Sequence, residues 1–285
     1  MICYIRPASV GPEAMSNPIP LDATLSVLVP VYNEEGTVAH VLDRVLALGP
    51  LVKEVVVVDD GSNDRTAEIV ESLARQEPRV RFFRQPVNQG KTAAIRRALA
   101  EATGDIIIIQ DADLEYDPAE IPEVIGPILT GHADVVFGSR FLVRRAARVL
   151  YFYHYLANRG LTFLSNLLTN RNMTDIETCY KAFRAGVIKP LTLTSRGFGM
   201  EVEITALVTK TRARTYEVPI SYYGRSYEEG KKIGMKDGVA ALYYIFYYNL
   251  VAPRLSAGRT YRAQVDGFLA RAGADAAAER VLRAV

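Results

Sequence analysis

The sequence predicts an α/β fold with a mostly parallel central sheet and helices on both faces. From Leu25 onward, short β-branched runs alternate with longer segments of helical period. The runs are apolar throughout instead of alternating with polar residues, which is typical of strands that are covered on both sides. With 285 residues and a hydrophobic content of 49%, the chain can bury a substantial core.

Five strands and four helices are expected in order along the first half of the chain. The strands are apolar runs bounded by Gly, Asp, Asn or Pro, at residues 25–31, 54–60, 79–85, 105–111 and 133–139. Good helix formers fill the segments between them, at 36–48, 64–76, 90–102 and 118–130. Ligands of such sheets bind at the carboxyl ends of the strands, so functional residues are expected there.

The pattern changes after Arg140. We expect an aromatic-rich helix, a second helix, a strand and a last helix, at 149–170, 200–210, 213–222 and about 233–250. The chain is thus divided into a flexible lead, a main domain, an amphipathic helix and an Ala/Arg-rich tail, at 1–24, 25–232, 233–253 and 254–285. The tail is expected to be a short surface helix whose deletion is tolerated.

Composition excludes several classes of protein. A formal net charge of +2 gives no electrostatic footprint for nucleic acid, and Cys3 and Cys179 cannot form a disulfide framework or a zinc site. The N-terminus lacks the pattern of a secretory signal, Met15 is an alternative start to Met1, and no uncharged stretch reaches the ~20 residues of a spanning helix. We therefore expect a cytosolic protein, and the oligomeric state is left open.

Acidic residues follow the first two expected strands. Glu34 follows the first, and Asp60 and Asp64 follow the second. Acids at such positions can accept hydrogen bonds from a base or from ribose hydroxyls. The alternative is that they cap helices, and this is the favoured interpretation for Asp64.

Two further segments carry chemistry. Gly90 and Lys91 open a helix after the third strand, where free N–H groups and a cation suit a diphosphate. Asp111, Asp113 and Glu115 directly follow the apolar strand IIIIQ. Such a spacing lets carboxylate oxygens converge on a hard divalent cation, and a helix cap is the less favoured alternative.

Taken together, these segments resemble a known family. The motifs PVYNEE, DDGSNDRT, NQGK, DADLEYDP and GSR occur in that order. In this order and spacing they resemble family-two glycosyltransferases of the GT-A fold, whose central sheet is Rossmann-like. Within that family they are similar to the dolichol-phosphate mannose synthase and polyprenyl-phosphate glycosyltransferase branch. The resemblance covers roughly Leu25 to Leu250 and identifies 25–232 as the catalytic domain.

The resemblance implies roles for individual residues. Asp111, Asp113 and Glu115 would hold Mg²⁺ or Mn²⁺. Arg225 and Lys231, on a Gly-containing loop, would close over the donor diphosphate. The nucleotide-sugar site would comprise Pro30, Tyr32, Glu34, Val58, Asp59, Asp60, Lys91, Asp111, Ala112, Asp113, Arg225 and Lys231.

The acceptor region matches the family less closely. Arg140, His154 and Asn158 are expected around an acceptor phosphate, and His154 is equally well explained as an ordinary helix histidine. Asp175 or Glu177 aligns with an acid near the acceptor. The catalytic set implied is Asp113, Arg225, Lys231 and Asp175, with Asp175 orienting the acceptor or acting as a base.

The implied reaction is inverting transfer of a hexose from GDP-mannose, UDP-glucose or another nucleotide sugar to a polyprenyl phosphate. Two alternatives stay open: a glycosyltransferase that acts on a sugar or glycolipid hydroxyl, and a nucleotidyltransferase of similar fold. A third, a catalytically silent nucleotide-sugar-binding module, is disfavoured because Asp111 and Asp113 are intact.

The late tyrosines suggest where a lipid would be met. Val239, Leu242, Tyr243, Phe246, Tyr247 and Leu250 share one helix face, and Tyr244 and Tyr248 enrich the other. Tyr favours the membrane–water boundary, so this helix is expected either to lie on the cytoplasmic face of a membrane or to pack on protein.

Overall fold

The computed structural model describes residues 19, 22–142, 151–197, 199–224 and 235–283. Its central feature is a seven-stranded sheet with the order β3-β2-β1-β4-β6-β5-β7. The strands are β1 Leu25–Val31, β2 Val52–Asp59, β3 Val80–Arg84, β4 Ile106–Ile109, β5 Val135–Ser139, β6 Lys181–Arg184 and β7 Thr215–Pro219. All neighbours pair in parallel except β6, which is antiparallel to both β4 and β5. The mostly parallel sheet is therefore confirmed.

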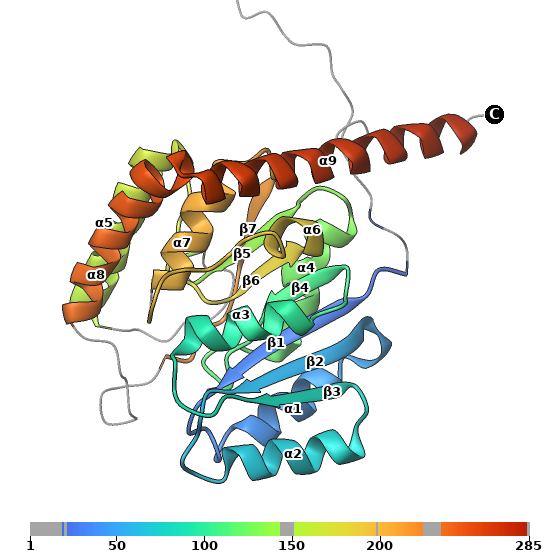
Figure 1. The fold of residues 1–285 in the computed structure, drawn as a ribbon, viewed down its shortest axis with the longest axis vertical. Coiled ribbons are helices and arrows are strands. Elements are labelled where there is room, and N and C mark those ends of the chain that lie inside the picture. Colours follow the sequence, from blue (N-terminus) through green and yellow to red (C-terminus); the bar gives the residue numbers. More distant parts are fainter. Residues whose placement is uncertain (1–18, 20–21, 143–150, 198, 225–234, 284–285) are drawn as a thin grey trace, which may run out of the picture.

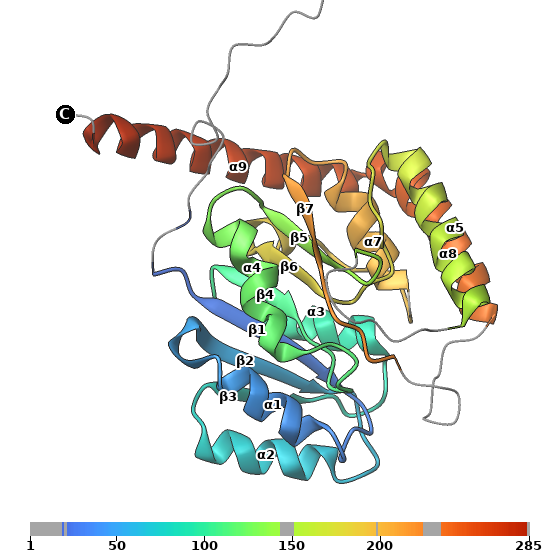
Figure 2. The same ribbon diagram turned by 180° about the vertical axis from the view of Figure 1, so that it is seen from behind.

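Helices cover both faces of this sheet (Figures 1 and 2). The helices are α1 Val38–Leu46, α2 Thr66–Gln76, α3 Lys91–Glu101, α4 Ile121–Leu129, α5 Phe152–Thr169, α6 Ala185–Ile188, α7 Gly199–Val208, α8 Met235–Phe246 and α9 Ser256–Arg283. Short turns of other helix types lie at Gly49–Leu51, Pro118–Glu120, Tyr247–Val251 and Ala252–Arg254.

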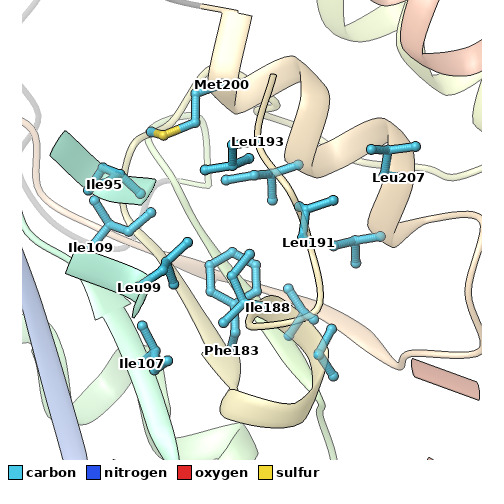
Figure 3. Packing of buried hydrophobic residues seen from close by; sticks show 14 of the residues in the cluster. Ile95, Leu99, Ile107, Ile109, Phe183, Ile188, Leu191, Leu193, Met200 and Leu207 are labelled. Atoms are coloured by element: carbon cyan, nitrogen blue, oxygen red, sulfur yellow. The ribbon is translucent and has the colours of Figure 1, made fainter. Parts of the chain in front are cut away.

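Two cores result from the alternation of side chains along the strands. Leu28, Ile107 and Ile109 point to one face, where they pack with α3 and with helices from the second half of the chain. Figure 3 shows Ile95 and Leu99 of α3 beside these isoleucines of β4. The intervening strand residues point to the other face and pack with α1, α2 and α4. Because each strand is buried on both sides, the apolar runs are continuous.

The sequence did not predict β6. Its four residues, KAFR, begin and end with a cation, and a run this short has no visible period. Both charged side chains are buried and have partners. Lys181 donates to the backbone carbonyls of Ile176 and Thr178, and Arg184 pairs with Asp134 at 3.3 Å. The strand is thus specified by tertiary contacts rather than by its own composition.

The tail is longer and more buried than the short surface helix that was expected. The tail forms α9, a helix of 28 residues, and its first half packs on the core. Tyr261 and Val265 are buried, and the Tyr261 hydroxyl donates to the Val187 carbonyl at 3.1 Å. Polar and small residues dominate the helix, so a few buried side chains such as Tyr261 and Val265 hold it against the core. Deletion of the tail would expose the core on the α3 face of the sheet, and the expected tolerance of such a deletion stays a prediction.

The end of the sheet at which the parallel strands begin is held by a buried carboxylate, that of Glu54 on β2. Its oxygens accept hydrogen bonds from Ser26 Oγ at 2.6 Å, from the Arg81 guanidinium at 2.6 Å and from Thr103 N at 2.6 Å. Burial alone would raise the pKa of Glu54, but these donors together lower it to about 2. Glu54 therefore joins β1, β2, β3 and the loop before β4.

We expect Glu54→Gln to lower the free energy of unfolding at pH 7 by about 2 kcal/mol, the usual value for hydrogen bonds to a charged group. The folded pKa lies below the ordinary value of 4.5, so the stabilisation is present above pH 4.5 and is lost as the pH falls toward 2. Urea titrations of both proteins at several pH values should show the difference shrinking with acid. An equal difference at pH 7 and pH 2.5 would contradict this account.

Candidate active site

The carboxyl ends of the parallel strands meet at one edge of the sheet, and the motif residues gather there. The loops after β1 and β2 are joined to each other. The backbone N–H of Asn33 donates to Ser62 Oγ at 2.9 Å, and that of Glu34 donates to Thr66 Oγ1 at 2.8 Å. Pro30, Tyr32 and Glu34 are half-buried beside this junction. Contact of these three with a nucleotide stays a prediction.

The two acids at the end of β2, Asp59 and Asp60, pair with neighbouring protein groups at this edge of the sheet. Asp59 is fully buried and pairs with Arg84 at 3.1 Å. Asp60 accepts hydrogen bonds from the backbone N–H groups of Gln89, at 2.9 Å, and Gly90, at 2.7 Å. Both carboxylates thus have protein partners, and Asp60 fixes the turn that leads into α3. Direct contact of either with a nucleotide stays a prediction.

Three other residues from the motifs have clear local roles. Asp64 accepts a hydrogen bond from the Thr66 N–H at 3.0 Å beside the start of α2, although Arg65 and not Asp64 holds the N-cap position. The Val58 side chain is fully buried in the core, so only its backbone can meet a ligand. Ala112 is also buried, and contact of its backbone with a nucleotide stays a prediction.

Lys91, the first residue of α3, points to the loop after β4. Gly90 precedes it with a φ of +90°, a conformation that favours glycine. The Lys91 ammonium lies 2.6 Å from Asp111 Oδ1 and 3.8 Å from Glu201 Oε1. Burial alone would lower the pKa of Lys91, but its acidic neighbours, Asp111 first, raise it well above the ordinary value. The ammonium is therefore a fixed positive charge beside Asp111.

The predicted metal ligands lie on the loop that follows β4. Asp113 Oδ1 accepts the Glu115 N–H at 3.1 Å, which tightens the turn, and Leu114 between them has a φ of +63°. Glu115 points elsewhere: its Oε2 accepts the Tyr222 hydroxyl at 2.8 Å. In the described part of the chain, no three acidic, His or Cys side chains are already gathered around a cation position.

Asp111 and Asp113 nevertheless fit a hard divalent cation. Both offer the carboxylate oxygens that such an ion prefers, and a cation would share the Asp111 carboxylate with the Lys91 ammonium, which lies 2.6 Å from Oδ1. Glu115 holds the segment after β7 through Tyr222, and also through its carbonyl, which accepts the Tyr223 N–H at 2.9 Å. Its role as a metal ligand stays a prediction that this geometry does not favour.

Arg140, directly after β5, forms the second half of the site with Asp175. The Arg140 Nε and Nη2 atoms donate to the two carboxylate oxygens of Asp175 at 2.7 and 2.8 Å. Asp175 is fully buried, and only 14% of the Arg140 side chain is exposed. A carboxylate held in this way orients the guanidinium and is poorly placed to accept a proton from an acceptor. The base role expected for Asp175 is therefore not favoured. Asp175 orients Arg140, and its expected orienting of the acceptor stays a prediction.

The remaining predicted residues are only partly placed. His154 and Asn158 lie four residues apart on one face of α5 and are half-buried there. The edge-on contact between Phe141 and Tyr155, at 5.3 Å, brings the start of α5 beside Arg140. Contact of His154 and Asn158 with a phosphate stays a prediction. Arg225 and Lys231, and the expected boundary at 232, lie outside the described residues.

Comparison with known proteins identifies the family. The family model for glycosyl transferase family 2 matches residues 26–192. The chain belongs to this family. A dolichol-phosphate mannosyltransferase of Pyrococcus furiosus is 32% identical over 213 residues, which are 74% of this chain and 59% of the relative.

Two other relatives support the predicted branch of glycosyl transferase family 2. An undecaprenyl-phosphate 4-deoxy-4-formamido-L-arabinose transferase of Edwardsiella ictaluri is 32% identical, over 73% of this chain and 62% of its own. A dolichyl-phosphate beta-glucosyltransferase of Trichomonas vaginalis is 34% identical, over 51% and 50%. The chain thus spans less than two thirds of the length of these relatives.

Solved structures confirm the GT-A fold. A glucosyl-3-phosphoglycerate synthase of Mycobacterium tuberculosis superposes with a TM-score of 0.62 over 80% of each chain, at 22% identity. At this identity the likeness concerns the fold alone.

Some residues of this family-two site were missed by sequence reasoning. Cys179 lies 3.0 Å from the Lys91 ammonium, and its thiol donates to Glu201 Oε1 at 3.2 Å. The signal for Glu201 was available: α7 carries two acids, Glu201 and Glu203, although all of its ten residues are buried. Buried acids in an apolar helix require partners. The Thr194 and Ser195 N–H groups satisfy Glu203 at 2.9 and 2.8 Å, whereas Glu201 faces the site.

Proposed function

We propose that this chain transfers a hexose, with inversion, from a nucleotide-diphosphate sugar to a polyprenyl monophosphate, with Mg²⁺ or Mn²⁺ as cofactor. The observation that carries the proposal is that two separate groups of charged side chains lie at the same edge of the sheet. Asp111, Asp113 and Lys91 suit a donor diphosphate, and Arg140, oriented by Asp175, suits an anionic acceptor. The names of the three relatives, all polyprenyl-phosphate sugar transferases, support the choice of acceptor.

The residues divide the work of the reaction. Asp111 and Asp113 would hold the divalent cation, which would supply charge neutralisation for the leaving diphosphate. Lys91 adds a fixed positive charge beside them. Arg140 would position the acceptor phosphate in line with the anomeric carbon. A phosphate oxygen is already anionic near neutral pH, so no strong base is needed, which agrees with Asp175 being occupied by Arg140.

We propose GDP-mannose or UDP-glucose as donor, and a thermal-shift panel of nucleotide sugars tests this. At one hundred times its Kd, the true donor should stabilise the protein by about 2.7 kcal/mol, or by several degrees in Tm. We expect the shift to need Mg²⁺ or Mn²⁺ and to disappear with chelator. Equal shifts with and without chelator would contradict the metal-dependent donor site.

An exposed apolar surface supports a peripheral membrane contact. On α8, Val239 is 65% exposed and Tyr243 is 61% exposed, whereas Ala241 and Ile245 on the opposite side are buried. This outward face is the one whose spacing was identified in the sequence. Beside it in both views lies α5, on which Phe163 and Leu167 are 70% and 69% exposed (Figures 1 and 2). We call the exposed apolar side chains of these two neighbouring helices together the apolar face.

No described helix is long and apolar enough to cross a bilayer. The apolar face mixes Tyr with aliphatic residues, as surfaces that lie in the membrane interface do. Such a contact would bring the chain close to a lipid acceptor. The cytoplasmic side of the membrane is part of this proposal.

Vesicle flotation tests the apolar face. We expect the protein to float with anionic vesicles that contain polyprenyl phosphate, and the Phe163→Ser/Val239→Ser double variant to bind at least tenfold more weakly, because each lost side chain removes about 1–2 kcal/mol of apolar burial. Leu129→Ser, a change of an exposed residue on α4, is the matched control and should float normally. If the parent protein remains in the dense fraction, the membrane contact is wrong.

A further inference from the structure

Tyr222, in the segment after β7, contacts both the loop that follows β4 and Arg140. Its hydroxyl donates to Glu115 Oε2 at 2.8 Å. Its ring lies against the Arg140 guanidinium, whose central carbon is 5.2 Å from the ring centroid, within the range of a cation–π contact. Arg140 directly follows β5, so this one side chain connects residues from two different strand ends.

Neighbouring groups hold Tyr222 in this position. The Tyr223 N–H donates to the Glu115 carbonyl at 2.9 Å, and the Tyr222 ring packs against the ring of Tyr116 with 5.4 Å between the centroids. A Cβ atom at Gly224 would lie 2.5 Å from Tyr222 Cε1, so glycine there leaves room for the ring. Burial, and then the Glu115 carboxylate, raise the pKa of Tyr222 above its ordinary value. The hydroxyl therefore keeps its proton and remains a donor.

The Arg140 guanidinium keeps one nitrogen for a ligand. Asp175 occupies Nε and Nη2, and Nη1 donates to no acceptor among the described residues. The Phe141 ring also lies near the guanidinium, with its centroid 5.7 Å from the central carbon. Asp175 and the two aromatic rings thus restrict the positions of the guanidinium, and its Nη1 group remains to donate to a phosphate oxygen.

We propose that Tyr222 is a positioning residue for sugar transfer. Its ring holds the Arg140 guanidinium in place for the acceptor phosphate, and its hydroxyl holds the loop after β4 in a fixed position relative to Arg140. The Glu115 N–H donates to Asp113 Oδ1 at 3.1 Å, so the hydroxyl contact leads directly to an expected metal ligand. The inference rests on the proposed function, which places the donor diphosphate at Asp113 and the acceptor at Arg140. Transfer requires these two substrates to be aligned, and a small misplacement is costly.

Two substitutions separate the ring from the hydroxyl. Tyr222→Leu removes both, and we expect the KM for farnesyl phosphate to rise about tenfold, the size of a buried cation–π contact. Tyr222→Phe keeps the ring, so the KM for farnesyl phosphate should stay within about twofold of that of the parent protein. Its kcat should nevertheless fall about tenfold, because the loop after β4 is no longer tied to the acceptor site.

Tyr216 provides the matched controls, because it is 45% exposed and lies near the beginning of β7. Tyr216→Leu and Tyr216→Phe should leave kcat and acceptor KM unchanged, and circular dichroism should show that the variants are folded. An unchanged acceptor KM in Tyr222→Leu would overturn the role of the ring, and so would an equal rise in Tyr222→Leu and Tyr222→Phe. An unchanged kcat in Tyr222→Phe would overturn the role of the hydroxyl.

A double variant tests whether the ring acts through Arg140. Arg140→Lys keeps a cation beside Asp175 but lacks the guanidinium, so adding Tyr222→Leu to it should raise the acceptor KM by far less than about tenfold. A further rise of about tenfold would overturn the inference, because the two losses would then be independent. Calorimetry with farnesyl phosphate should show the same pattern in Kd without transfer, and equal Kd values for the parent protein and Tyr222→Leu would overturn the inference alone. Failure of the parent protein to glycosylate farnesyl phosphate would instead overturn the proposed function, and this inference with it.

Discussion

Asp113→Asn is expected to reduce sugar transfer by at least a thousandfold and to abolish divalent-dependent donor binding. The amide has the same size and can still accept the Glu115 N–H, which Asp113 Oδ1 accepts at 3.1 Å, so the turn after β4 should survive. What is lost is one of the two carboxylate charges that would hold the cation. Neutralising the leaving group is usually the largest single contribution to such a reaction, so kcat should fall more than KM.

The measurement is kcat and donor binding over a series of Mn²⁺ concentrations, with circular dichroism to confirm folding. Asp43→Asn is the control, because Asp43 is an exposed acid on α1. It should leave transfer unchanged. Full activity of Asp113→Asn, or of the parent protein in the presence of chelator, would refute the metal assignment.

Asp175→Asn should lower stability strongly and weaken acceptor binding. Removing one charge leaves the Arg140 guanidinium buried without its counterion, which typically costs about 3–5 kcal/mol. The guanidinium also loses the carboxylate that orients it, so we expect the KM for a phosphate acceptor to rise at least tenfold. Since Asp175 does not abstract a proton in this account, kcat should fall by a much smaller factor.

Asp134→Asn provides a matched control for Asp175→Asn. Asp134 is also buried and accepts from the Arg214 guanidinium at 2.9 Å with each oxygen, but it lies away from the site edge, before β5. The two variants should lose similar stability in urea titrations, and only Asp175→Asn should change the acceptor KM. A drop in kcat of a thousandfold with unchanged acceptor KM in Asp175→Asn would instead make this residue the base, and would favour a hydroxyl acceptor.

Much of the fold follows from local sequence because the strands are long apolar runs. All five strands predicted before Arg140 are present, and the acids and Lys91 that follow them meet at one edge because parallel strands end together. Prediction failed where a segment has neither a long apolar run nor a clear hydrophobic period. Lys181–Arg184 is a strand because its charges find buried partners, and Ser256–Arg283 is held to the core by a few side chains such as Tyr261 and Val265.

The pairings within the site could not be predicted for a related reason. Whether Asp175 is a base or a positioning residue depends on Arg140, 35 residues away in the chain. Likewise, Glu115 has the spacing of a metal ligand, but one of its carboxylate oxygens accepts the Tyr222 hydroxyl. The spacing of the motifs predicts which residue types lie at the sheet edge. Only the tertiary structure shows which hydrogen-bond or ion-pair partners they have.

Product analysis with a phosphate and an alcohol acceptor tests the central claim most directly. The full chain is incubated with labelled GDP-mannose or UDP-glucose and Mn²⁺, and with either farnesyl phosphate or farnesol. We predict a labelled glycosyl phosphate of inverted configuration from one of the two donors, no product from farnesol, and no product when Mn²⁺ is removed by chelator. Transfer to farnesol at a comparable rate, or transfer to farnesyl phosphate that persists in chelator, would contradict the account.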